Sequence, residues 1–83
     1  MRVELTPTAA KEFVEQPNII RTRLTSMVQR LGKWPLVNGA KAFRERGRRL
    51  YRYRSGDWRF QFLLKPHSII IEHIERRHLF DRD

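Results

Sequence analysis

The second half of the chain alternates apolar and polar residues, and this pattern limits the possible folds more than any other feature. Residues 48–54 and 58–64 repeat with a period of two, and residues 69–74 form a last, strongly apolar run. A period of two indicates β-strands, because successive side chains point to opposite faces of a sheet. Turn-forming residues at 55–57 and 65–68 separate the runs. Turns this short predict a three-stranded antiparallel meander.

The first half of the chain predicts a strand followed by two helices. Residues 2–6 alternate, which favours a short opening strand. Thr6 or Thr8 is suited to cap a first helix that ends before Pro17. A second helix is expected over residues 18–31, where apolar residues recur at helical spacing: Ile20, Leu24, Met27, Val28 and Leu31. The short link between the helices predicts an antiparallel two-helix hairpin.

Residues 33–47 have no sustained period, so they are predicted to be a connector, with Trp34, Leu36 and Phe43 as its anchors in the core. The order of elements predicts an α+β fold with one sheet: an N-terminal strand, the helical hairpin and the meander. At 83 residues, a single domain over 1–83 is the default. The absence of cysteine excludes disulfides and cysteine metal sites.

The two faces of the predicted meander differ in chemistry. The aromatic residues fall on one face and are expected to pack on the helices: Tyr51, Tyr53, Trp58, Phe60 and Phe62. Stacking on RNA bases is the alternative use of such residues, but so short a chain needs them in its core. The opposite face carries Arg52, Arg54 and Arg59. Three guanidinium groups on one face repel each other unless an anion or a carboxylate joins them.

The net charge of +9 points to an anionic partner, because 18 Lys and Arg residues face 9 Asp and Glu residues. Most of the cations are arginine, whose planar fork matches phosphate. RNA is therefore the favoured partner, while a membrane surface, an acidic protein or a merely basic surface stays open. The chain has no long apolar run and no signal-peptide core, so we expect a soluble, cytoplasmic protein.

The histidines and the remaining acids give weaker signals. His73 lies inside an apolar strand and is expected to be structural, and Glu72 and Glu75 are expected to form salt bridges. His78 suits a general acid near neutral pH, or is an ordinary residue of a polar tail. The histidines are far apart and lack a ligand pattern, so neither a metal nor another cofactor is expected.

The hairpin over residues 50–60 resembles the RelE/ParE superfamily of bacterial toxins. It has the pattern aromatic-Arg-apolar-Arg, then Gly-Asp-aromatic-Arg-apolar. Residues 5–11, 34–41 and 74–80 are also similar to that superfamily, so the resemblance covers nearly the whole chain. The helices are short for the ParE type, which favours the branch of RelE, HigB and YoeB.

The resemblance implies the toxin of a type II toxin–antitoxin system, a metal-independent endonuclease that cuts mRNA on the ribosome. In that chemistry the 2′-hydroxyl of the RNA attacks the adjacent phosphate. The implied catalytic residues are Arg59, Arg54, Arg77 and His78. The residues implied to bind RNA phosphates are Arg52, Arg76, Lys41 and Arg49. The implied partners are a cognate antitoxin and ribosome-bound mRNA, with no membrane.

The chain departs from the family pattern at two positions. Phe80 stands where the family has a tyrosine and cannot donate a proton, and Leu50 stands where some members have a lysine. His78 would then supply the proton. Two alternatives to the nuclease remain: a ParE-like inhibitor of DNA gyrase, and a catalytically silent module that binds RNA or an antitoxin.

Overall fold

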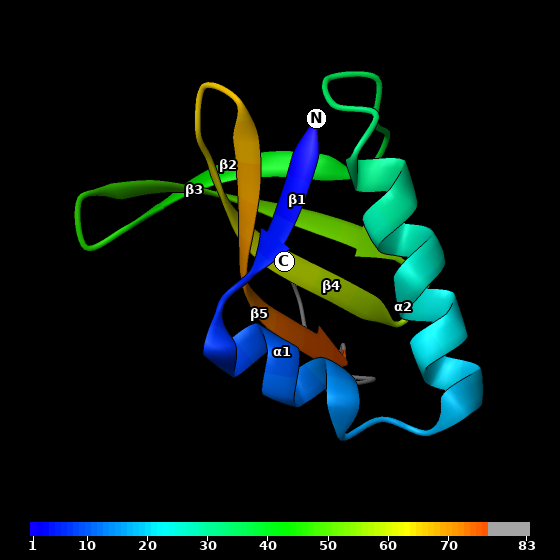
Figure 1. Ribbon diagram of the computed structural model, residues 1–83. Helices are drawn as coiled ribbons and strands as arrows, with labels where there is room; N and C mark the ends of the chain where they lie inside the picture. Colours follow the sequence, from blue (N-terminus) through cyan, green and yellow to red (C-terminus); the bar gives the residue numbers. More distant parts are fainter. Residues whose placement is uncertain (77–83) are drawn as a thin grey trace.

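A mixed five-stranded sheet and two helices make up the fold, in a computed structural model that describes residues 1–76 (Figure 1). In chain order the elements are β1 (Arg2–Leu5), α1 (Pro7–Val14), α2 (Asn18–Leu31), β2 (Ala40–Glu45), β3 (Arg48–Ser55), β4 (Trp58–Leu64) and β5 (Ser68–Arg76). The strand order is β1-β5-β4-β3-β2, and only the β1–β5 pair is parallel. The α+β class and the meander, β3-β4-β5, are confirmed.

Four strands follow the helices, and not the three that the sequence predicts, because β2 lies inside the expected connector. In the described part of the chain β2 is an edge strand with mostly exposed residues, so no buried face imposes an alternating pattern. The β2–β3 turn places Arg46 (φ 52°) and Gly47 (φ 77°) in the left-handed region. Two such residues are typical of a type I′ hairpin turn, but Arg-Gly lacks its usual Asn-Gly or Asp-Gly signature.

Both helices form where the sequence predicts them. The hydroxyl of Thr6 accepts a hydrogen bond from the Ala9 N–H at 3.1 Å, and Pro7 occupies the first turn. The second helix has the predicted bounds, Asn18–Leu31. The helices are not the close hairpin that their short link predicts, because α1 packs mainly on β5. Each helix buries its own apolar stripe on the sheet instead of on its neighbour.

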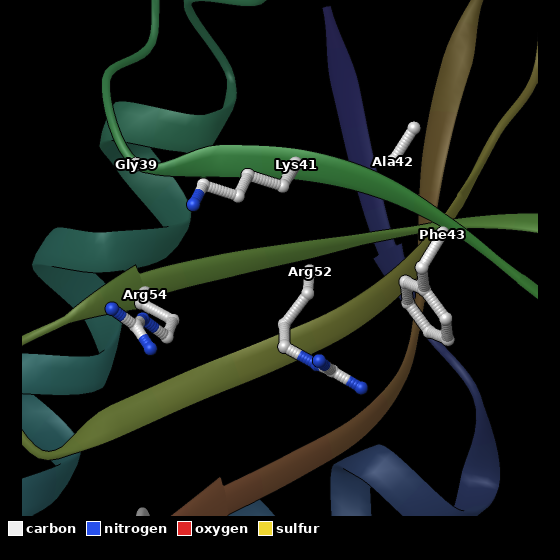
Figure 2. Close-up of a pocket in the computed structure, with 6 residues that line it drawn as sticks. All are labelled: Gly39, Lys41, Ala42, Phe43, Arg52 and Arg54. Carbon is white, nitrogen blue, oxygen red and sulfur yellow. The ribbon is translucent and has the colours of Figure 1, made fainter. Parts of the chain in front are cut away.

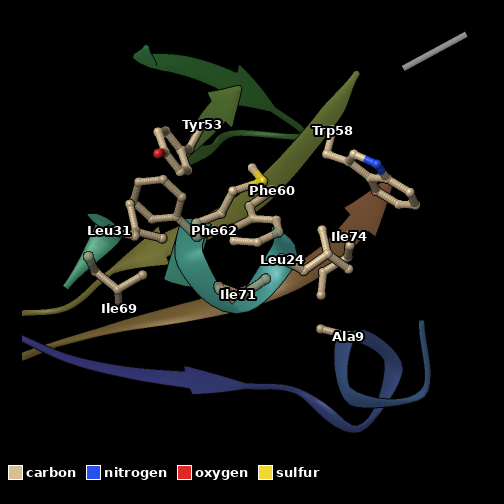
Figure 3. Packing of buried hydrophobic residues seen from close by; sticks show 11 residues of the cluster. Ala9, Leu24, Leu31, Tyr53, Trp58, Phe60, Phe62, Ile69, Ile71 and Ile74 are labelled. Carbon is tan, nitrogen blue, oxygen red and sulfur yellow. The ribbon is translucent and has the colours of Figure 1, made fainter. Parts of the chain in front are cut away.

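The core lies between the helices and one face of the sheet (Figure 3). Aromatic residues of β3 and β4 meet three residues of α2, and all of them are buried: Tyr53, Trp58, Phe60, Phe62, Leu24, Met27 and Leu31. The predicted assignment of the aromatic face is therefore confirmed, with Tyr51 partly buried at its margin.

Only one of the three predicted connector anchors packs into the core. The ring of Trp34 lies edge-on to Tyr51 and Phe62, with centroids 5.2 and 5.6 Å apart. Leu36 is 86% exposed, and the Phe43 ring packs against Arg52 on the other face of the sheet. Assigning Leu36 and Phe43 to the core was wrong, because β2 turns Phe43 away from the helices. Val37 packs against the core in the same segment.

Side chains complete the edge of β5 where β1 ends. β1 pairs with residues 68–71 only. Beyond that point the Thr6 hydroxyl donates to the Glu72 carbonyl at 3.2 Å, and the Ile74 N–H donates to Glu12 Oε1 at 2.9 Å. These bonds continue the pairing that a longer first strand would have provided. They tie the second half of β5 to α1, the half that carries Glu75.

Gly39→Ala is expected to destabilise the protein by about 2–3 kcal/mol, and Gly47→Ala by about 1 kcal/mol. Both glycines have positive φ, 91° and 77°, which disfavours any residue with a Cβ. Only at Gly39 would the Cβ also meet backbone, the Arg54 carbonyl oxygen at 2.8 Å. Urea unfolding of the two variants tests this difference. Equal losses would show that the contact with Arg54 does not restrict this position.

Candidate functional site

Four of the predicted site residues share the sheet face opposite the core, and this set is called the basic face: Lys41, Arg52, Arg54 and Arg59. The register pairs Lys41 with Arg52 across β2 and β3, and Arg54 with Arg59 across β3 and β4. Directly paired residues point to the same side of a sheet, as do residues two apart along one strand. The strands thus bring four of the eight predicted site residues together.

A hollow of about 270 Å³ lies on the basic face, beside the start of β2 (Figure 2). Its lining combines three cations with small or aromatic residues: Gly39, Lys41, Ala42, Phe43, Arg52 and Arg54. The guanidinium carbon of Arg52 lies 4.4 Å from the centre of the Phe43 ring, a cation–π contact. The backbone N–H of Arg54 also donates a hydrogen bond to the Gly39 carbonyl oxygen at 3.1 Å. Cations around a small depression suit a phosphate group and the sugar attached to it.

A carboxylate joins the cluster at Arg59. Nε and Nη2 of Arg59 donate to Oε2 of Glu75 at 3.2 and 3.1 Å, across the β4–β5 pair. The Arg59 side chain is only 19% exposed, whereas that of Glu75 is 44% exposed. The like-charge pair of Arg54 and Arg59 therefore has a negative charge beside it, which offsets part of the repulsion. The predicted salt-bridge role of Glu75 is confirmed.

Two predicted site residues lie away from the basic face. Arg49 is next to Leu50 on β3, so it points to the same side as Tyr51, and its guanidinium lies 5.7 Å from the Tyr51 ring. Arg76 pairs with Trp58, a core-facing residue, and is 73% exposed with Asp57 Oδ2 at 4.0 Å. Neither side chain is oriented towards the basic face.

The remaining two predicted site residues, Arg77 and His78, lie outside the described residues, as does Phe80. Leu50, at the family's lysine position, is fully buried on the same side of the sheet as Arg52. At this position the chain therefore has a buried apolar side chain below the basic face instead of a further cation.

The sequence reading missed two contributors to this face. Phe43 was assigned to the core, although its spacing from Lys41 by two residues on a strand would have placed it beside that lysine. Arg48 lies on the same face and binds Glu72, with Nη2 and Oε2 2.6 Å apart. The predicted salt-bridge role of Glu72 is thereby confirmed. No sequence signal identifies Glu72 as the partner of Arg48. The pairing of β4 with β5 shifts its register between Gln61 and Phe62, and this shift sets the direction of the Glu72 side chain.

The described histidines take peripheral positions. Nδ1 of His73 lies 3.8 Å from Glu12 Oε1, while His67 is exposed in the β4–β5 turn. Over residues 1–76, no three His, Cys, Asp or Glu side chains gather closely enough to hold a metal ion. In the same range, no helix has the length and apolar character needed to cross a membrane.

The fold is similar to that of RelE toxins of known structure. The RelBE2 toxin–antitoxin complex of Mycobacterium tuberculosis matches with a TM-score of 0.78 and 17% identity, covering 92% of this chain and 96% of that chain. The RelE–RelB complex of Pyrococcus horikoshii matches with a TM-score of 0.74 and 21% identity, covering 94% of this chain and 96% of that chain. The isolated Escherichia coli RelE toxin matches with a TM-score of 0.73 and 11% identity, covering 93% of this chain and 84% of that chain.

No protein-family model and no curated protein matches the chain. The similarity therefore lies in the fold, one sheet with two helices on one face. The chain has the RelE toxin fold over about nine tenths of its length. The fold implied by the resemblance in the sequence is thus confirmed.

Proposed function

We propose that this chain is the toxin of a type II toxin–antitoxin system and cleaves mRNA on the ribosome. The observation that carries the proposal is the convergence of Lys41, Arg52, Arg54 and Arg59 on one face of a RelE fold. Arginine forks on a single face suit a chain of phosphates better than a single small anion. A hollow bounded by three of these cations provides room for a nucleotide.

The proposed reaction is a transesterification within the RNA. The 2′-oxygen bonds to phosphorus, the bond from phosphorus to the 5′-oxygen breaks, and the products carry a 2′,3′-cyclic phosphate and a 5′-hydroxyl. The 2′-hydroxyl loses its proton and the leaving 5′-oxygen gains one. Negative charge grows on the non-bridging oxygens in the transition state, and Arg59 is assigned to stabilise it. His78 is assigned to protonate the leaving oxygen.

The other cations of the basic face are proposed to hold the RNA strand. Lys41, Arg52 and Arg54 lie on two neighbouring strands, so they span several ångströms of the sheet around the hollow. Holding successive phosphates fixes the backbone so that the 2′-oxygen lies in line with the bond that breaks. The roles of Arg49 and Arg76 in RNA binding, and of Arg54 and Arg77 in catalysis, remain predictions.

An antitoxin protein is the proposed second partner. The Mycobacterium and Pyrococcus structures are complexes of RelE with RelB. A partner that neutralises this chain is proposed to cover the basic face, because acidic groups there would exclude RNA phosphates. Unchanged affinity of the antitoxin for Arg52→Ala with Arg54→Ala would contradict that placement.

Tightly controlled expression followed by mapping of mRNA 5′ ends tests the proposal. New ends at a fixed phase of the codons are expected, and they should vanish in Arg59→Ala. Intact mRNA together with lost DNA supercoiling would indicate a gyrase inhibitor instead. Intact mRNA with normal supercoiling and normal growth would indicate a silent binding module.

The silent module is the second candidate because of one observation. Glu75 already holds Arg59, the residue assigned to stabilise the transition state. If that ion pair never presents Arg59 to a phosphate, the face would bind RNA without cutting it.

Arg52→Ala combined with Arg54→Ala is expected to weaken binding of single-stranded RNA and to lower its salt dependence. Each lost phosphate contact reduces the slope of log K against log salt by about 0.7 for single strands. The slope should therefore fall by about 1.4 for the double variant. Arg2→Ala with Arg21→Ala is the matched control, because it removes the same charge from β1 and α2. Equal slopes for the two double variants would contradict an RNA site on the basic face.

A further inference from the structure

Glu75 holds one edge of the Arg59 guanidinium group. The register of β4 and β5 sets the two residues directly opposite each other. Both Nε and Nη2 of Arg59 donate to the same carboxylate oxygen, at 3.2 and 3.1 Å. Two bonds to one acceptor fix the orientation of the guanidinium plane, and the low exposure of Arg59, 19%, limits its alternative rotamers.

These bonds set the direction of the Arg59 guanidinium group. Arginine has five N–H donors in a rigid planar fork, and the Nε edge of Arg59 faces Glu75. We propose that Glu75 is a positioning residue, which holds Arg59 by its Nε edge and thereby fixes the plane in which the guanidinium group meets the scissile phosphate. This inference rests on the proposed nuclease function.

The charge of Glu75 has a separate effect on RNA. A carboxylate beside Arg59 offsets the repulsion between Arg54 and Arg59, but it also repels an incoming phosphate. Removing the charge should therefore strengthen RNA binding while loss of the hydrogen bonds slows cleavage. Opposite changes in affinity and rate are characteristic of positioning, because a general loss of stability lowers both.

Two other roles for Glu75 give different results. A carboxylate that only occupies the phosphate position would be displaced by RNA, and its removal would leave the cleavage rate unchanged or raise it. A general base that takes the proton of the 2′-hydroxyl would fail equally with glutamine or alanine, because a neutral amide cannot take that proton. A positioning residue instead tolerates glutamine, whose amide oxygen still accepts from Arg59 Nε.

The test compares Glu75→Ala, Glu75→Gln and the control Glu72→Gln. Cleavage is measured in a single turnover at saturating ribosome-bound mRNA, and affinity is measured with an RNA oligonucleotide blocked by 2′-deoxy sugars. Glu75→Ala is expected to lower the rate by about 10- to 100-fold, whereas Glu75→Gln should stay within about threefold of wild type. Both should bind the oligonucleotide more tightly. Glu72→Gln removes a charge bonded to Arg48 and should leave the rate unchanged.

An NMR signal gives a readout that does not depend on cleavage. The Arg59 Nε–H should be observable in the wild type and in Glu75→Gln, lost by exchange in Glu75→Ala, and retained when the blocked oligonucleotide binds. Loss of the signal on binding, or a glutamine variant as slow as the alanine variant, would overturn the proposal. A wild-type protein that cuts no RNA would count against the nuclease function alone, since the signal still tests how Arg59 is held.

Discussion

Arg59→Ala is expected to slow RNA cleavage by about 100- to 1,000-fold, the usual loss when one donor to a developing negative charge is removed. The Arg59 side chain is only 19% exposed, and Glu75 fixes the plane of its guanidinium group. Little stability should be lost, because the Glu75 carboxylate left behind is 44% exposed and stays hydrated. Single-turnover cleavage together with thermal unfolding separates the two effects.

Two further variants make this result specific. Arg59→Lys keeps the charge but loses the planar fork, so it should recover only part of the lost rate. Arg2→Ala is the matched control, because Arg2 also pairs with a glutamate, Glu4 at 2.9 Å, but belongs to β1. Arg2→Ala should cleave like the wild type. A rate for Arg59→Ala close to that of Arg2→Ala would remove Arg59 from the mechanism.

Phe60→Ala is expected to destabilise the protein by about 3–5 kcal/mol, enough to leave a small domain barely folded. Its side chain is fully buried at the centre of the core, next to the Tyr53 ring at a centroid distance of 6.1 Å. Alanine would leave a cavity between α2 and the sheet that the surrounding side chains fill only in part. The midpoint of urea unfolding measures the loss, provided that the slope of the transition stays constant.

Leu36→Ala is the control for that loss, because Leu36 is an apolar side chain with 86% exposure. Its effect should stay within about 0.5 kcal/mol. If Phe60→Ala does not fold at all, Phe60→Leu, which keeps most of the volume, should give a smaller and measurable loss. Similar midpoints for Leu36→Ala and the Phe60 variants would show that Phe60 does not hold the core together.

Alternating patterns allowed the buried strands to be predicted from the sequence. Tyr53, Phe60 and Phe62 recur with period two, so the core face of β3 and β4 follows directly from the residues. The second helix is equally clear, because its stripe repeats at helical spacing and Pro17 stands at its start. These elements each bury one face, and burial is what imposes a pattern on a sequence.

Elements without a buried face could not be read in the same way. β2 is exposed on most of its length and its turn uses Arg46 and Gly47, so neither a period nor a turn signature marks it. The parallel pairing of β1 with β5 joins segments more than 60 residues apart, and no local signal reports that contact. The prediction therefore missed a strand and, with it, the place of Phe43.

The basic face was partly predictable for the same reasons. Arg52, Arg54 and Arg59 follow from strand alternation and from the hairpin that joins β3 to β4. The pairing of Glu75 with Arg59 could not be derived, because it depends on the register of β5 against β4 and on the irregularity within that pair. The position of Arg76 opposite Trp58 could not be derived either, because it depends on the same register.

Cleavage of a defined mRNA in a purified translation system, with and without ribosomes, tests the central claim most directly. The expected result is a set of new 5′ ends at one phase of the codons, formed only when ribosomes are present and lost in Arg59→Ala. The upstream fragments should end in 2′,3′-cyclic phosphate. Intact mRNA after incubation of the folded wild-type protein with translating ribosomes would contradict the proposed function.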